Sequence, residues 1–297
     1  MRMTIKIPLF RSRLIPFLLF FLICLTLPAS LFCEEAGKGN EFEKLIQKLV
    51  DDGFDRGKIE QIFSSKEISF TPETVSQFFI HSESSLDYDQ FTSPKAIESA
   101  LNYLGDNKEI LDKAEEIFGV DKTVITAILL VETRLGSYLG NRTVINTLST
   151  MAALSDETLR ERVWNSIPDE KKPVREAFIK KARDKTDWGY NELKALLQYT
   201  EKEGVAPESI KGSYAGALGV SQFMPSNALK LARDGDNDGK IDLFNHADAI
   251  FSVANYLKHH GWQSGITRQR QHEILFRYNH SNYYVDTLLK ISDKLKG

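Results

Sequence analysis

The chain has 297 residues, of which 42% are hydrophobic, and its 38 basic and 41 acidic residues give a formal net charge of −3. This length and apolar content exclude a disordered chain and suffice for one large domain or two ordinary domains with a hydrophobic core. The near-neutral charge argues against a nucleic-acid-binding protein, and two cysteines exclude both a disulfide framework and a four-thiolate zinc site.

Residues 1–33 have the layout of an export signal. An apolar run at 14–27 is followed by Pro28-Ala29-Ser30 and preceded by four basic residues: Arg2, Lys6, Arg11 and Arg13. This order is typical of a secretory signal peptide, and the apolar run is short for a membrane span, which needs about 20 residues. We therefore predict export, with an uncleaved membrane anchor as the alternative.

Cys33 raises a third possibility, because bacterial lipoproteins begin at a lipidated cysteine. Phe32 precedes it where a small residue is expected, so lipidation is not favoured. Without the four basic residues of the signal, the remaining chain carries a charge of −7. An exported chain almost without cysteine is typical of a bacterial protein that folds without disulfides, so we predict localisation in the periplasm or cell envelope. Membrane anchoring through the N-terminus stays open.

Helical periodicity dominates the rest of the chain. Apolar residues recur at helix spacing in 42–49, 97–104 and 111–118, and the same pattern runs through about 121–135, 173–184, 190–203, 247–260 and 284–295. No long alternating pattern predicts a sheet, so we expect an all-α fold with at most a minor β component. We place a helical N-terminal extension at 34–94 and the main domain at 95–297.

Residues 155–212 are polar and contain Pro168, Pro173, Gly189 and Gly204 as widely spaced helix breaks. This composition predicts a variable helical insertion at about 155–205, between two better-defined segments. We expect irregular loops at roughly 136–146, 204–221 and 233–246.

Glu132 stands near the end of an unusually apolar helical segment. Asp121 can cap the start of this helix, and Gly136 is a natural stop. Glu132 lies on the same row as Ile125 and Ile128, so we expect it to be largely buried. Burial and the negative end of the helix dipole both raise the pKa of a carboxylate, which suits a general acid. A structural ion pair with Arg134 is the alternative.

The segment 212–219 holds three glycines and three other small residues within eight positions, so its backbone can approach a ligand or another segment closely. The alternative interpretation is a tight packing loop, with Gln222 capping the next helix.

An acidic loop follows at 234–248. Asp234, Asp236 and Asp238 occupy positions 1, 3 and 5 of an EF-hand-like loop, Gly239 occupies position 6, and Lys240 offers its carbonyl at position 7. Asn245 stands at position 12 in place of the usual glutamate. We predict a structural calcium site, with a sodium site or an ordinary acidic surface turn as alternatives.

Four blocks of the sequence together resemble the lytic murein transglycosylase B family, which cleaves peptidoglycan. In family order they are VETRLG at 131–136, GSYAGALGVSQFMPS at 212–226, SVANYLKHHGW at 252–262 and RYNHS at 277–281. The resemblance covers roughly residues 95–295 and is weakest around 155–205. It implies a lysozyme-like helical transglycosylase domain at 95–297.

The resemblance also implies the chemistry. Glu132 would be the sole catalytic carboxylate, whereas ordinary glycosidases use two. It would protonate the glycosidic oxygen between N-acetylmuramic acid and N-acetylglucosamine, and then deprotonate the muramic C6 hydroxyl, which attacks C1. The product would be a 1,6-anhydromuramic end, with no water consumed and no cofactor needed.

Further residues follow from the same motifs. The family places Ser213 and Gln222 in the sugar cleft, and it places Tyr278 near the catalytic glutamate and Asn279 near an N-acetyl group. We predict six substrate-binding residues: Ser213, Tyr214, Gln222, Tyr278 and Asn279 from the blocks, and Tyr284 as an extension of the wall at Tyr278 and Asn279. Tyr283 is an alternative to Tyr284 in the same wall. The family's last calcium carboxylate corresponds to Asp248, and Leu135 replaces an aromatic residue often found at that step.

We therefore expect a monomeric enzyme whose partners are peptidoglycan glycan strands. A non-catalytic peptidoglycan-binding envelope protein with the same fold is the alternative. A calcium-dependent regulator is a third reading, but it leaves Glu132 unexplained.

Overall fold

Helices make up most of this computed structural model, which describes residues 41–81 and 87–297. The predicted export segment and Cys33 lie outside the described residues. The first helices are α1 (Glu43–Asp51), α2 (Arg56–Phe63), α3 (Pro72–Ile80), α4 (Pro94–Asp106), α5 (Lys108–Phe118), α6 (Lys122–Thr133) and α7 (Val144–Ala152). They are followed by α8 (Glu157–Asn165), α9 (Arg175–Glu203), α10 (Pro225–Leu231), α11 (His246–His259), α12 (Arg268–Tyr278) and α13 (Asn282–Lys296). Short 3-10 turns lie at Asp89–Thr92, Ala153–Ser155, Asp169–Lys171 and Pro207–Ser209.

The β component is small, as predicted. Strands β1 (Arg142–Thr143) and β2 (Lys211–Gly212) pair antiparallel, with Arg142 opposite Gly212 and Thr143 opposite Lys211. The all-α prediction is therefore confirmed. Within the part of the chain that the structure describes, no helix is both long enough and apolar enough to cross a membrane.

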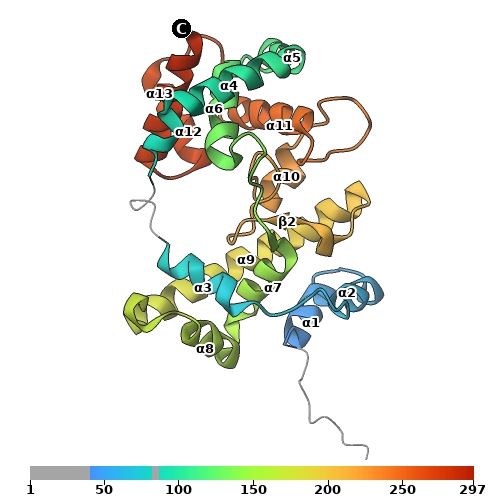
Figure 1. Ribbon diagram of the computed structural model, residues 1–297. Helices are drawn as coiled ribbons and strands as arrows, with labels where there is room; N and C mark the ends of the chain where they lie inside the picture. The colour runs from blue at the N-terminus through green and yellow to red at the C-terminus, as the bar shows by residue number, and fades with distance from the viewer. Residues whose placement is uncertain (1–40, 82–86) are drawn as a thin grey trace, which may run out of the picture. The chain divides into compact units, whose positions relative to one another are not determined.

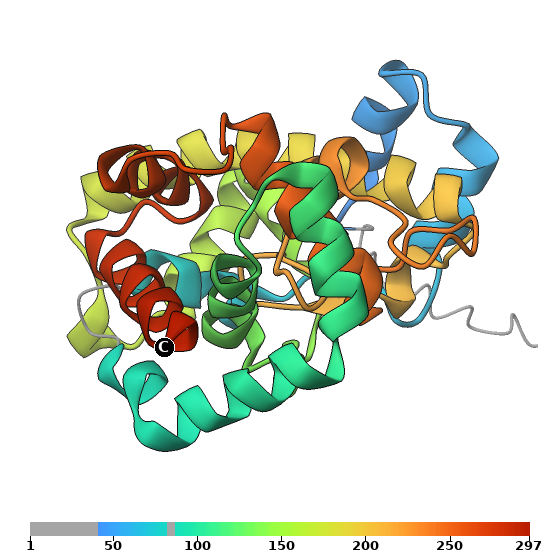
Figure 2. The same cartoon turned by 90° about the horizontal axis from the view of Figure 1, so that it is seen from above.

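Helix α6 is buried at the centre of a first group of helices, which also contains α4, α5, α11 and α13. Every residue from Thr123 to Leu130 is buried, because α4, α5, α11 and α13 pack around it (Figures 1 and 2). Asp121 stands at its N-cap position as predicted, but its side chain does not cap the helix. The carboxylate instead pairs with Lys296 at the end of α13, with 2.7 Å between Oδ2 and Nζ.

A second group of helices is centred on α9. The sequence predicted two helical stretches separated at Gly189, and this was wrong, because α9 is a single helix of 29 residues. Gly189 is a contact point with α7: a Cβ atom there would lie 2.7 Å from the Cβ of Met151. The glycine therefore lets two helices approach closely and does not break the helix. Gly204 ends α9 in a left-handed conformation, as expected for a C-terminal glycine.

Helix α10 packs against both α9 and α11, and so connects the two groups of helices. The segments between α-helices at 134–143, 204–224 and 232–245, of which the first two contain β1 and β2, lie close to the three loops predicted from the sequence. These loops carry much of the site described below.

We predict opposite effects for two glycine-to-alanine substitutions inside helices. Alanine is normally favoured over glycine in a helix by about 1 kcal/mol. Gly105→Ala in α4 should stabilise the protein, because its new methyl group meets nothing within 4 Å. Gly189→Ala should destabilise it by about 1–3 kcal/mol, because the methyl group overlaps Met151. Urea denaturation measures both changes, and equal stabilisation by the two would contradict the packing role of Gly189.

Candidate active site

The turn after α6 places Glu132 at the edge of a cleft. Glu132 is half-buried on the last turn of the helix, whereas Ile125 and Ile128 on the same row are completely buried. The burial expected from the sequence therefore holds for the helix but only in part for the carboxylate. The side chain lines a cleft of about 540 Å³.

The helix ends three residues earlier than the Gly136 stop that the sequence predicted. Arg134 (φ 50°) and Leu135 (φ 59°) adopt left-handed conformations, which costs on the order of 1 kcal/mol for each residue that is not glycine. Their N–H groups donate to the carbonyls of Leu130 and Leu129, both at 3.0 Å. Gly136 continues the turn at φ 85°, and a Cβ atom there would lie 2.9 Å from the ring of His246.

Thr133 fixes this turn to a second loop of the site. Its hydroxyl is 2.9 Å from the carbonyl oxygen of Val220, to which it donates, and it accepts a hydrogen bond from the N–H of Gly136 at 3.0 Å. The side chain is only 1% exposed. The end of the helix that carries Glu132 is thus tied to the loop that carries Gln222.

The glycine-rich loop at 212–219 is held in one conformation by internal hydrogen bonds. The N–H of Ser213 donates to the carbonyl of Ala217 at 2.9 Å, and the Ser213 hydroxyl accepts from the N–H groups of Ala215 and Ala217. Gln222 does not cap the next helix. Its amide donates to the carbonyls of Gly219 and Leu139, at 3.0 and 3.3 Å. Ser213, Tyr214 and Gln222 all line the cleft.

Tyr284 is in direct contact with Glu132. Its hydroxyl donates to Oε1 of Glu132 at 2.6 Å. Burial, and then the charge of Glu132, raises the pKa of Tyr284 well above its usual value, so the phenol stays protonated and remains a donor. Asn279 also lines the cleft, whereas Tyr283 points to solvent and is 65% exposed.

Tyr278 stands behind the cleft. Its hydroxyl donates to the carbonyl of Ser221 at 2.6 Å, and its ring stacks against Tyr284 at 6.4 Å between centroids. Burial and the charge of Glu132 raise its pKa as well. Of the six predicted substrate-binding residues, Tyr278 is thus the one that is not among the residues lining the cleft.

One wall of the cleft comes from residues that the sequence did not suggest. They come from the end of α3, the segment before α4, and the residues from the turn after α6 to the start of β1: Gln77, His81, Asp87, Tyr88, Gln90, Phe91, Tyr138, Asn141 and Arg142. A hydrogen bond from Arg134 to Gln90 (2.8 Å) joins this wall to the turn after α6. These residues lie outside the four recognised blocks, and their local pattern gave no signal.

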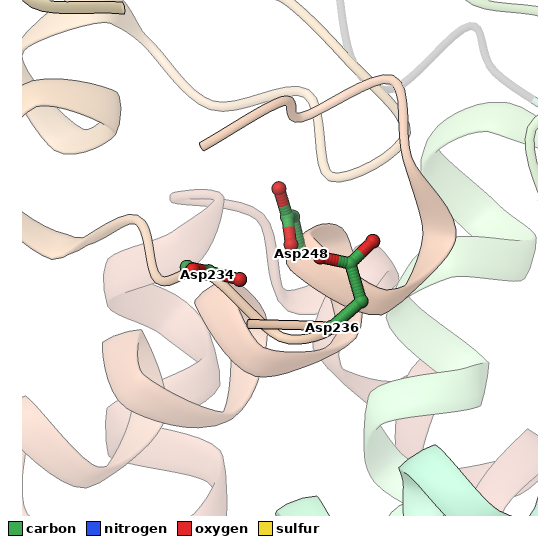
Figure 3. Close-up of side chains that lie close together, drawn as sticks. All are labelled: Asp234, Asp236 and Asp248. Carbon is green, nitrogen blue, oxygen red and sulfur yellow. The ribbon is translucent and has the colours of Figure 1, made fainter. Parts of the chain in front are cut away.

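The acidic loop brings three of its predicted ligands together. Oxygen atoms of Asp234, Asp236 and Asp248 lie within 4.8 Å of one another (Figure 3). Asp238 and Lys240 are exposed on the same loop, and the Asp238 carboxylate accepts from the N–H of Lys240 at 2.8 Å.

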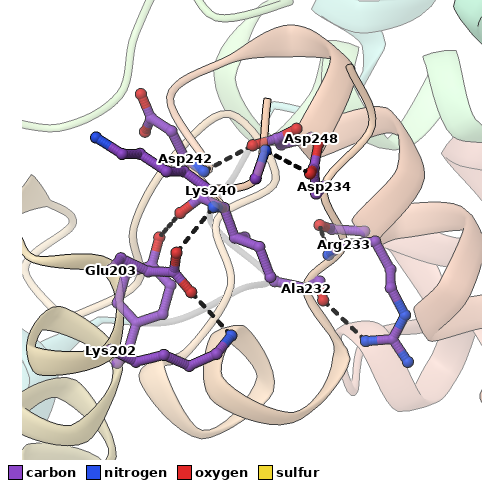
Figure 4. A network of polar contacts seen from close by, with 12 residues as sticks. Lys202, Glu203, Ala232, Arg233, Asp234, Lys240, Asp242 and Asp248 are labelled. Carbon is purple, nitrogen blue, oxygen red and sulfur yellow. Dashed lines mark hydrogen bonds and ion pairs between the residues drawn. The ribbon is translucent and has the colours of Figure 1, made fainter. Parts of the chain in front are cut away.

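Asp248 is the buried member of this cluster and is only 2% exposed. Its two oxygens accept from the N–H groups of Gly235 and Asp242, both at 2.7 Å (Figure 4). Burial raises the pKa of Asp248, the two N–H groups oppose this, and the charges of Asp236 and Asp234 add to it. Hard oxygen donors in this arrangement match the donor set that calcium prefers, so the residues present fit such an ion.

The C-terminal end of the acidic loop is joined to the glycine-rich loop and to the turn after α6. The N–H of Val220 donates to the carbonyl of Leu243 at 2.8 Å. The ring of His246 lies against Gly136 and contacts the hydroxyl of Tyr103, with 2.8 Å between Nδ1 and the hydroxyl oxygen. The segment 243–246 therefore supports both the glycine-rich loop and the turn after Glu132.

The transglycosylase SLT domain family matches residues 37–273 of the chain. The chain is also similar to the membrane-bound lytic murein transglycosylase B of Escherichia coli (strain K12), with 31% identity over 176 residues. That alignment covers 59% of this chain and 41% of the other protein, so the chain spans less than half the length of this curated relative.

Two solved structures resemble the fold. One is the soluble lytic transglycosylase SltB1 from Pseudomonas aeruginosa, with a TM-score of 0.69, 22% identity, and coverage of 85% of this chain and 97% of that one. The other is the E. coli lytic transglycosylase SLT35 in complex with calcium, with a TM-score of 0.67, 22% identity, and coverage of 87% and 93%. The lysozyme-like transglycosylase fold expected from the sequence is therefore confirmed.

We predict that Thr133 stabilises the turn through its hydroxyl. Thr133→Val keeps the shape but leaves the Val220 carbonyl and the Gly136 N–H without this partner, so it should lower the free energy of unfolding by about 2 kcal/mol. Thr133→Ser keeps the hydroxyl and should lose less than about 1 kcal/mol. Urea denaturation compares the two variants, and equal losses would show that the methyl group matters and the hydroxyl does not.

Proposed function

The chain belongs to the transglycosylase SLT domain family, and from this membership and the geometry of the cleft we propose that it is a lytic transglycosylase of peptidoglycan. It cleaves the β-1,4 bond between N-acetylmuramic acid and N-acetylglucosamine without water. The observation that carries this proposal is the position of Glu132, which lies in the last turn of a buried helix, lines the cleft and accepts a hydrogen bond from Tyr284.

The first step needs a protonated Glu132. Its carboxyl group gives the proton to the glycosidic oxygen, and the bond between this oxygen and the muramic C1 breaks. The leaving N-acetylglucosamine end then carries the proton as a hydroxyl group. Positive charge develops on the muramic ring during this step.

The second step uses the same residue as a base. Ionised Glu132 removes the proton of the muramic C6 hydroxyl, and the C6 oxygen bonds to C1. This closes the 1,6-anhydro ring and returns Glu132 to its protonated form, so atoms and charge balance without water. Tyr284 holds Oε1 of Glu132 at 2.6 Å and thereby fixes the orientation of the carboxylate for both steps.

The remaining predicted residues bind and position the sugars. Ser213, Tyr214, Gln222 and Asn279 line the cleft and provide hydroxyl and amide groups for sugar hydroxyls and N-acetyl groups. Tyr278 does not line the cleft. Its ring stacks on Tyr284 and its hydroxyl donates to the carbonyl of Ser221, so it supports residues of the cleft wall. We assign it a supporting role.

The alternative of a non-catalytic peptidoglycan-binding protein is less well supported, because Glu132 and four polar binding residues gather in one cleft. We also propose export to the envelope through residues 1–33, with lipidation at Cys33 left open, and a monomer. The division into an N-terminal extension at 34–94 and a catalytic domain at 95–297 remains a proposal. Six described residues of that extension line the cleft: Gln77, His81, Asp87, Tyr88, Gln90 and Phe91.

We further propose that the loop 234–248 holds a structural calcium ion. Asp234, Asp236, Asp238 and Asp248 would bind it through carboxylate oxygens and Lys240 through its carbonyl. This is supported by the cluster of three carboxylates and by the calcium in the similar SLT35 structure. The ion would neutralise the repulsion within the cluster and stiffen the segment that supports the catalytic turn.

The products of purified peptidoglycan test the proposed reaction. The mature protein should release 1,6-anhydromuropeptides, which mass spectrometry distinguishes from products with a reducing end. Glu132→Gln cannot donate a proton and should lower turnover by at least about 100-fold while glycan binding persists.

Asp87→Asn is the matched control, because among the described residues Asp87 is the other carboxylate that lines the cleft, and it is exposed. It should retain most of the activity. Loss of activity in both variants, together with release of reducing-end products by the unsubstituted protein, would indicate a two-carboxylate hydrolase instead.

Thermal unfolding with and without calcium tests the ion. At a calcium concentration 100 times the Kd, the native state gains about 2.7 kcal/mol, which raises Tm by roughly 5–10 °C relative to chelator. Asp236→Asn should abolish this increase, and it should raise Tm in chelator because it relieves repulsion with Asp234 and Asp248. Asp242→Asn removes the same charge outside the cluster and should keep the calcium response. If calcium raised the Tm of Asp236→Asn as much as that of the wild type, the three carboxylates would not be the calcium site.

A further inference from the structure

A second, smaller hollow adjoins the catalytic cleft. It has a volume of about 170 Å³ and shares Asn141 and Arg142 with the lining of the cleft. The rest of its lining is uncharged and polar: Thr71, Thr74, Thr143, Asn146 and Thr147. A ligand in the cleft that carries a side branch could therefore extend past Arg142 into this hollow.

The walls of the hollow are held in place by hydrogen bonds. The Asn146 amide donates to the carbonyl of Glu67 at 2.8 Å, and its oxygen accepts from the N–H of Ser69 at 3.3 Å. The N–H of Thr71 donates to the hydroxyl of Thr150 at 2.9 Å. These bonds fix the start of α3 against α7, two helices that also pack against each other (Figure 1). The hollow therefore exists before any ligand binds.

Several polar groups around the hollow have no partner among the described residues. The Arg142 side chain is exposed and forms neither an ion pair nor a hydrogen bond with the described residues, although the chain as a whole is acidic. The hydroxyl of Thr147 is buried without a hydrogen-bond partner, and that residue is only 1% exposed. The Thr147 hydroxyl calls for an explanation, because buried polar atoms in proteins are nearly always paired. The Arg142 guanidinium is a cation beside the same hollow that is available to a ligand.

The proposed substrate carries a branch of matching chemistry. Each muramic sugar bears a lactyl group, and in intact peptidoglycan a peptide stem extends from that group. The stem presents amide groups and carboxylates. A guanidinium group binds a carboxylate through two parallel hydrogen bonds, and hydroxyl and amide side chains suit peptide groups.

We propose that this hollow binds the peptide stem of the substrate and that Arg142 pairs with a carboxylate of the stem. The inference rests on the proposed function, since that function places the muramic sugar beside Glu132. It makes Arg142 a residue that distinguishes strands with stems from strands without them.

Lys211 provides a matched control for Arg142. It lies on β2 opposite Thr143 and donates to the Thr143 hydroxyl at 2.8 Å, but it lines neither the cleft nor the hollow. Lys211→Gln and Arg142→Gln remove the same charge from paired strands. An effect of general electrostatics would appear in both variants, whereas a direct contact appears only in Arg142→Gln.

Calorimetric titration tests the inference in the full chain carrying Glu132→Gln, which keeps the ligands intact. The two probes are a GlcNAc–MurNAc disaccharide with a tetrapeptide stem and the same disaccharide with the peptide removed. The stem should lower Kd by about tenfold, which is typical of one charge-assisted hydrogen bond. Arg142→Gln should remove most of this difference, Arg142→Lys should restore part of it, and Lys211→Gln should leave it unchanged.

Two results would overturn the inference. Equal Kd values of the two probes for the protein with Arg142 intact would show that the stem is not bound. Equal weakening of both probes by Arg142→Gln would place Arg142 on the sugar or on the lactyl carboxylate. Because the readout is binding, failure of the proposed catalytic reaction would appear separately, as absence of anhydro products in the turnover assay.

Discussion

The hydroxyl of Thr133 connects the two halves of the active site, and the geometry around Glu132 depends on it. A buried helix can hold a side chain of its last turn firmly only if its end is fixed, and α6 is followed by two residues with unfavourable left-handed conformations. The hydrogen bonds of Thr133 to Val220 and Gly136 compensate for this strain. They also join Glu132 to the loop that positions Gln222 and Ser213.

Support for this turn comes from parts of the chain that are distant in sequence. Tyr284 on α13 holds the carboxylate, and His246, at the start of α11, fills the space beside Gly136. The acidic loop connects to the same region through Leu243. A calcium ion in that loop would thus act on the site through the rigidity of the segment 243–246, without touching the substrate.

The sequence predicted the parts of the fold and site that depend on local pattern. Helical periodicity identified α6, α11 and α13, and the family blocks identified Glu132, Ser213, Gln222 and Asn279, which all line the cleft. Tyr284, predicted as an extension of the same wall, lines it as well. It misread Gly189 as a break, because the close contact with α7 that explains this glycine is tertiary. The wall formed by His81, Asp87 and Arg142 was also missed, because only folding brings these residues to the cleft.

The central claim is that one carboxylate cleaves the glycosidic bond without water, and cleavage in water enriched in ¹⁸O tests it most directly. If the C6 hydroxyl attacks C1 in the site built around Glu132, the muramic product contains no ¹⁸O and is 1,6-anhydro throughout. Incorporation of one ¹⁸O atom at C1 in the primary product would contradict the account and show that water is the nucleophile.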